Sequence, residues 1–124
     1  MQQLLAIAGG GALGAVLRFG MSNSIDRLLG RDFPYGTLAV NILGSLLVGF
    51  LFVLFIERIA VSAEWRMGLL VGLLGSFTTF SAFSFETLAL FDAGDPLKAL
   101  LNIIMSIVFC LLATWLGMLL GKQI

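Results

Sequence analysis

Four long apolar stretches run through the chain, and short clusters of charged residues separate each stretch from the next. A helix needs about 20 predominantly apolar residues to cross a hydrocarbon core of about 30 Å. The expected spans cover residues 4–25, 33–56, 66–91 and 97–121. Little chain remains outside them, so we expect residues 1–124 to form a single all-α domain of four transmembrane helices.

Composition supports this interpretation and excludes several classes of function. Of the 124 residues, 60% are hydrophobic and 11% are charged, whereas soluble domains are nearer half apolar and a quarter charged. The formal net charge of zero gives no basic surface for nucleic acid. There is no His and only one Cys, so acid–base machinery, a disulfide and a cysteine-rich metal site are not expected. We therefore expect a membrane transport protein and not an enzyme.

The basic residues divide evenly between the two sides of the membrane. Of the seven, three fall on each side and Arg18 lies within the first span. The positive-inside rule therefore favours neither orientation. Two interpretations stay open: other signals fix the orientation, or the chain inserts both ways and pairs as an antiparallel, dual-topology homodimer. The residues counted are Arg58, Arg66 and Lys122 on one side and Arg27, Arg31 and Lys98 on the other.

Pairs of glycines four residues apart indicate close helix packing in lipid. Such packing could lie within one protomer or between protomers, and both interpretations stay open. The pairs are Gly10/Gly14, Gly68/Gly72 and Gly117/Gly121.

The third span carries the least helical sequence. Gly72 and Gly75 precede a dense group of Ser and Thr residues, and both features disfavour a continuous helix. We expect a break near Gly75–Thr79, with a bent but intact helix as the alternative. Irregular backbone survives at membrane depth only where protein buries it or water reaches it. Carbonyl groups freed there could hold a cation.

Phe80 and Phe83 follow the expected break at helical i, i+3 spacing. Such a pair is often only a packed or lipid-facing stripe. The edge of an aromatic ring, however, carries partial positive charge. Ring edges aimed into a pore could coordinate an anion without trapping it, which conduction requires.

Polar residues also form lines along the second and fourth spans. Such lines predict the wall of a narrow hydrophilic track, although a single Asn can simply bond between helices. In the first span, Arg18 either snorkels to the interface, attracts an anion or pairs with Glu86. The lines are Thr37, Asn41 and Ser45, and then Asn102, Ser106, Cys110 and Thr114.

Taken together, these motifs resemble the Fluc (CrcB) family of bacterial fluoride channels over nearly the whole chain. The third-span motif is the most specific. The matching residues are Gly-Gly-Gly-Ala-Leu-Gly14 with Arg18, then Gly36-Thr37 with Asn41 and Gly44, then Gly75-Ser-Phe-Thr-Thr79-Phe80-Ser81-Ala-Phe83-Ser84-Phe-Glu86.

The resemblance implies an antiparallel homodimer in the bacterial inner membrane that exports fluoride passively through two pores. It implies a structural Na⁺ at the dimer interface, held by main-chain carbonyls of Gly75 and Thr78. Phe80 and Phe83 would be the pore phenylalanines and Asn41 a pore donor. The other implied pathway residues are Arg18 near a vestibule, Thr79 and Glu86 beside the pore, Ser106 and Cys110 on a polar track, and in addition Ser81 and Ser84.

Three residues depart from the family pattern: Phe19 stands where Tyr is common, Cys110 where Ser often stands, and Asn102 where an aromatic can occur. The leading alternative is a proton-coupled antiporter of the small-multidrug-resistance type, also with four spans and dual topology. That class relies on an acid in its first span, and this first span holds Arg18 and no acid. A purely structural membrane subunit would not need polar lines in three spans.

Overall fold

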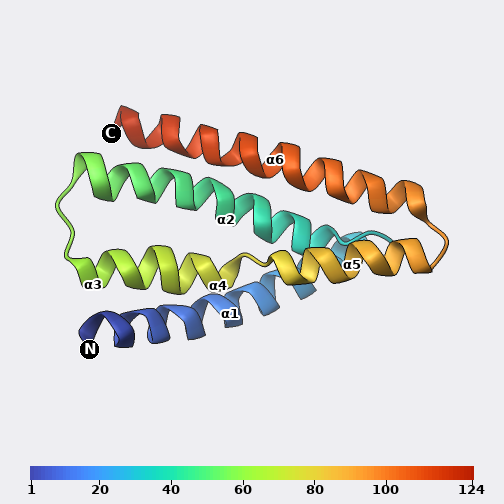
Figure 1. The fold of residues 1–124 in the computed structure, drawn as a ribbon, viewed down its shortest axis with the longest axis horizontal. Helices are drawn as coiled ribbons and strands as arrows, with labels where there is room; N and C mark the ends of the chain where they lie inside the picture. Colours follow the sequence, from blue (N-terminus) through green and yellow to red (C-terminus); the bar gives the residue numbers. More distant parts are fainter.

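The computed structural model describes all residues 1–124 and consists of helices joined by short connections (Figure 1). Four helical stretches are long and apolar enough to cross a membrane: Gln2–Leu29, Tyr35–Arg58, Ala63–Asp92 and Pro96–Gln123. The chain is therefore a multi-pass membrane protein. Its elements are α1 (Gln2–Leu29), α2 (Tyr35–Val53), η1 (Leu54–Arg58), α3 (Ala63–Arg66), η2 (Met67–Leu74), α4 (Gly75–Phe77), α5 (Phe80–Asp92) and α6 (Pro96–Gln123), of which η1 and η2 are π-helical.

The helices lie roughly side by side along the long axis of the molecule (Figure 1). The main contacts are those of α6 with α2 and of α1 with η2. Both chain ends and the connection from η1 to α3 lie at one end of the bundle, and the connections from α1 to α2 and from α5 to α6 lie at the other (Figure 1). The basic residues therefore sort to the two ends as the sequence predicts.

Local sequence explains where several helices start and stop. Gly30 follows α1 with φ 93° and Gly94 follows α5 with φ 83°, a left-handed conformation that glycine adopts without strain. Pro96 begins α6, where its missing N–H removes no helical bond. Ser62 caps α3 by accepting a hydrogen bond from the Trp65 N–H.

The glycine pairs pack against other helices of the same protomer. A Cβ at Gly14 would overlap the Leu73 carbonyl, and one at Gly10 would overlap the Gly68 carbonyl, so α1 and η2 touch backbone to backbone. Likewise, a Cβ at Gly117 would overlap the Leu46 carbonyl of α2. The remaining members, Gly68, Gly72 and Gly121, meet Ala6, Ile7 and Phe50 respectively. Packing within the protomer accounts for all three pairs.

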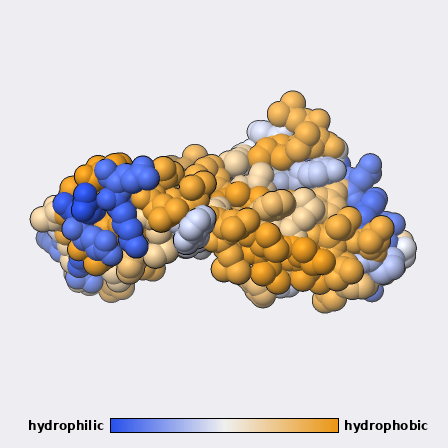
Figure 2. Space-filling view, turned by 90° about the horizontal axis from the view of Figure 1, so that it is seen from above, coloured by the Kyte–Doolittle hydropathy of each residue, from blue (hydrophilic) through white to orange (hydrophobic).

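Most of the surface is apolar. Only 19 of the 124 residues are buried, so most Leu, Ile, Val and Phe side chains face outward. Figure 2 shows the apolar side chains over the middle of the molecule and the hydrophilic ones gathered towards its two ends. This distribution fits a protein whose middle is solvated by hydrocarbon.

The third membrane-crossing stretch changes its backbone conformation near its middle. Gly75 is helical, with φ −63° and ψ −35°. Thr78 and Thr79 are extended, with φ −82° and ψ 155° for Thr78 and φ −151° and ψ 114° for Thr79. The chain returns to helix at Phe80. Helix η2, which ends at Leu74 just before these residues, is π-helical. This geometry is rare in proteins, and where it occurs it often marks a functional site.

Candidate functional site

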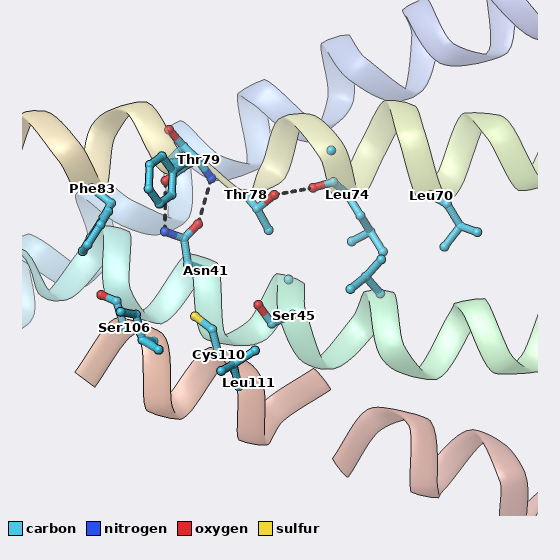
Figure 3. A pocket seen from close by; sticks show the side chains of 15 residues that line it. Asn41, Ser45, Leu70, Leu74, Thr78, Thr79, Phe83, Ser106, Cys110 and Leu111 are labelled. Atoms are coloured by element: carbon cyan, nitrogen blue, oxygen red, sulfur yellow. Dashed lines mark hydrogen bonds between the residues drawn. The ribbon is translucent and has the colours of Figure 1, made fainter. Parts of the chain in front are cut away.

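A hollow of about 440 Å³ opens beside the two extended residues, between α2, the third crossing stretch and α6 (Figure 3). Its wall contains no charged side chain. The polar groups come from three elements, and two aromatic rings complete the wall. The residues important here are Asn41, Ser45, Gly75, Thr78, Thr79, Phe80, Phe83, Ser106 and Cys110.

Asn41 joins α2 to the extended segment through both ends of its side-chain amide. Its Nδ2 donates to the Thr79 carbonyl at 3.0 Å, and its Oδ1 accepts from the Thr79 N–H at 2.8 Å (Figure 3). Extended backbone at membrane depth needs such partners, because lipid tails cannot supply them. Asn41 thus pairs with both main-chain groups of the extended residue Thr79.

Two carbonyl groups, those of Gly75 and Thr78, lack the hydrogen bonds that they would have in a continuous helix. In a continuous helix the Gly75 carbonyl would accept from the Thr79 N–H, four residues on, but that N–H donates to Asn41. The Thr78 carbonyl would accept from the Ala82 N–H, but that N–H donates at 3.1 Å to Thr79 Oγ1, which caps α5. Both carbonyls therefore lack their helical partners and can coordinate another group.

Phe80 and Phe83 lie next to each other at the start of α5. Their ring centroids are 5.3 Å apart and the rings are tilted by 48°. Both line the hollow, and Phe80 is 78% exposed. A tilted pair of this kind can present ring edges, which carry partial positive charge, to a group in the hollow.

On α6, Ser106 and Cys110 line the hollow and Thr114 does not. Thr114 Oγ1 instead donates to the Ser45 carbonyl of α2 at 3.1 Å. Only part of the predicted polar line on α6 therefore faces the hollow.

Four predicted pathway residues lie outside this hollow, namely Arg18, Ser81, Ser84 and Glu86. Ser84 Oγ donates to the Phe80 carbonyl at 3.0 Å, and Ser81 Oγ lies 3.2 Å from Thr79 Oγ1. Glu86 Oε1 accepts from Thr37 Oγ1 at 2.7 Å, and Glu86 lines a second hollow near Asp26 and Arg31.

The pairing of Arg18 with Glu86, one of the three interpretations of Arg18, is wrong. Arg18 Nε donates to the Ser76 carbonyl at 3.0 Å. Because Ser76 lies in the last helical turn before the extended residues, its carbonyl is among those that a helix end leaves unpaired. Thr37 takes the place expected for Arg18 as the partner of Glu86.

One buried residue near the site was not singled out by the sequence. Thr87 is 5% exposed and bonds to Asn102 at 2.9 Å. Its spacing of four residues from Phe83 is the only sequence signal that could have drawn attention to it.

Comparison with known proteins identifies the fold family. The sequence profile of the family described as CrcB-like protein, Camphor Resistance (CrcB), matches residues 5–118. The chain belongs to the CrcB family. This membership does not favour the antiporter alternative.

Relatives of this CrcB chain carry a shared description. The protein of Methylococcus capsulatus is 55% identical over 121 residues, which are 98% of this chain and 53% of the relative. The protein of Hydrogenovibrio crunogenus is 50% identical, covering 98% of this chain and 92% of the relative. That of Coxiella burnetii is 48% identical and matches both chains over their full length. All three are described as the fluoride-specific ion channel FluC. The chain spans about half the length of the first relative.

Proposed function

We propose that this CrcB chain is a fluoride-selective channel that lets cytoplasmic fluoride leave the cell down its electrochemical gradient. The observation that carries the proposal is the full-length similarity to proteins described as fluoride-specific channels. The uncharged hollow supports it, because its amide, hydroxyl and ring-edge groups are those that can replace water around a small anion.

A wall without charged side chains favours conduction over tight binding. Fluoride is small and strongly hydrated, so a pore must offer donors in place of its water. A full positive charge in the wall would hold the ion, whereas dipolar donors let it enter and leave. In this proposal Phe80, Phe83 and Asn41 take the leading roles, and Ser106 with Cys110 continues the pathway along α6.

The shape of one protomer favours a second copy as partner. Phe80 is 78% exposed, and polar groups in an open hollow would face hydrocarbon if nothing covered them. We infer that an antiparallel copy covers the hollow, because the basic residues at the two ends balance three against three. Two copies related by a two-fold axis bring two equivalent hollows, hence two pores per dimer.

The freed carbonyls of Gly75 and Thr78 fit a bound Na⁺. Oxygen atoms suit a hard cation, and the N–H groups that would occupy these carbonyls donate elsewhere. Gly75 is exposed on the protomer, so a copy in the opposite orientation can contribute the same groups. Na⁺ would then act as a structural bridge between the protomers.

The driving force for export would come from the membrane potential. In a bacterial inner membrane that is negative inside, each 100 mV drives an anion outward with about 2.3 kcal/mol. No energy-coupling motif is needed for transport in that direction. The pathway residues Thr79, Ser81, Ser84, Glu86 and Arg18 complete the proposed conduction route or its mouths.

Fluoride efflux from liposomes that contain the purified protein tests the proposal. The liposomes hold potassium fluoride with Na⁺ present, and valinomycin releases the compensating potassium. A fluoride electrode should record rapid loss, and liposomes loaded with potassium chloride should retain their anion. Absence of fluoride loss from folded protein, or equal loss of chloride, would refute a fluoride-selective channel.

A further inference from the structure

The three buried polar residues of the chain form one continuous series of hydrogen bonds. Asn102 is 2% exposed, Thr87 5% and Ser106 9%. Ser106 Oγ donates to Asn102 Oδ1 at 3.5 Å, and Asn102 Nδ2 donates to Thr87 Oγ1 at 2.9 Å. Thr87 Oγ1 in turn donates to the Phe83 carbonyl at 2.7 Å.

The two end residues of this hydrogen-bonded series line the hollow, and the two middle residues do not. Ser106 and Phe83 line the hollow, whereas Asn102 and Thr87 do not. Asn102 and Thr87 therefore touch two wall residues from outside, and any effect they have on an ion must pass through those residues.

Helix α5 depends on such contacts more than α2 and α6 do, each of which has six buried residues. Thr87 is its only buried residue, so apolar packing fixes its rotation weakly. Three hydrogen-bonded residue pairs hold α5 and its cap to the neighbouring helices: Asn41 with Thr79, Thr37 with Glu86, and Asn102 with Thr87. Only the last of these joins α5 to α6.

We propose that Asn102 and Thr87 are a positioning pair that fixes the rotation of α5 and thereby the angle of the Phe83 ring. This inference rests on the proposed channel function. The amide of Asn102 suits the role because its two ends act in opposite senses, accepting from Ser106 on its own helix and donating to Thr87 on α5.

The longest hydrogen bond of the series, from Ser106 to Asn102, leaves the Ser106 hydroxyl weakly held. The Ser106–Asn102 distance of 3.5 Å lies at the long limit of a hydrogen bond, whereas the other two bonds are short. The Ser106 hydroxyl can therefore turn from Asn102 to an anion in the hollow at little cost, while the pair Asn102–Thr87 stays closed.

The test measures fluoride efflux for Thr87→Val, Asn102→Leu and the double variant. Both changes keep the approximate shape of the side chain and remove its hydrogen bond. From the usual worth of a bond between membrane helices, each should slow efflux about threefold to tenfold. The double variant should be no slower than the worse single one, because both remove the same interaction.

Two further variants separate positioning from mere support of the fold. Thr87→Ser retains the hydroxyl and should restore most of the efflux. In a Phe83→Ile background, Thr87→Val should slow the residual efflux no further, since the ring it positions is gone. Ser24→Ala is the control, because it removes another hydroxyl bond, from Ser24 Oγ to the Gly20 carbonyl of α1, that reaches neither α5 nor the hollow. Its efflux should stay near that of the unmodified chain.

The outcomes distinguish this inference from the proposed function. If the unmodified chain does not pass fluoride, the channel proposal fails. If it does, and Phe83→Ile slows it while Thr87→Val and Asn102→Leu do not, the positioning pair is wrong and the channel stands. Equal further slowing by Thr87→Val with and without the Phe83 ring would also overturn the pair, because a general loss of stability would explain both.

Discussion

The side-chain amide of Asn41 pairs with both main-chain groups of Thr79, through bonds of 3.0 and 2.8 Å. An amide used in this way stands in for the backbone of a neighbouring strand. It allows two residues to remain extended inside a membrane-crossing stretch, where unpaired N–H and C=O groups are costly. One α2 side chain thus supports the geometry from which the candidate ion sites follow.

Asn41→Leu should damage both stability and conduction. The change leaves the Thr79 N–H and carbonyl without partners, at about 1–3 kcal/mol for each unsatisfied group. We expect a lower thermal melting point in detergent and strongly reduced fluoride efflux. Asn23→Leu, on α1 and away from the hollow, is the matched control and should change neither quantity much. A normal melting point for Asn41→Leu would show that the pairing with Thr79 does not hold the extended segment.

Phe80→Ile and Phe83→Ile should each slow fluoride efflux without preventing dimer formation. An aromatic contact is worth roughly 1 kcal/mol, so losing one ring edge should slow efflux about fivefold or more. Size-exclusion chromatography checks the dimer, and the fluoride electrode measures the rate. Phe85→Ile is the control, because Phe85 is 75% exposed on the same helix and does not line the hollow. Equal slowing by all three changes would remove the special role of the two wall residues.

Gly14→Ala should destabilise the fold far more than Gly9→Ala. A Cβ at Gly14 would overlap the Leu73 carbonyl, whereas a Cβ at Gly9 has no atom within 4 Å. Overpacking of this kind costs about 1–3 kcal/mol, and alanine in an open helical position costs nothing. Thermal melting followed by tryptophan fluorescence compares the two variants. Similar melting points would contradict the backbone contact between α1 and η2.

Replacing Na⁺ by a large organic cation should weaken the protein if the Gly75 and Thr78 carbonyls hold the ion. We expect slower fluoride efflux and easier separation of the dimer, both reversed when Na⁺ is added back. K⁺ at the same concentration serves as the ionic-strength control and should restore less. Unchanged efflux and dimer stability after exhaustive removal of Na⁺ would leave these carbonyls without a structural ion.

The sequence predicts the four spans and most of the residues that line the hollow. Both follow from the length of each apolar stretch and from the polar residues that interrupt it. Partners across helices cannot be read in that way. Arg18 could reach several groups, and only helix rotation determines that it meets the Ser76 carbonyl while Thr37 meets Glu86. The same holds for Thr87, which is an ordinary helix residue until α6 brings Asn102 against it.

The exact position at which the third stretch leaves the helical conformation could not be predicted from the sequence either. Residues 75–79 combine Gly with Ser and Thr, which identifies a weak region but not the residues that leave the helix. Gly75 is helical, and the extended residues are Thr78 and Thr79. Their position depends on Asn41, which lies 38 residues earlier in the chain.

An even number of crossings brings the outer ends of α1 and α6 to the same end of the bundle (Figure 1). Joining two copies through a short flexible linker would therefore force them to point the same way. A single-chain version of an antiparallel pair requires an odd number of additional membrane crossings in the linker. Fusions with and without one extra helix between the copies would thus produce opposite relative orientations from identical domains.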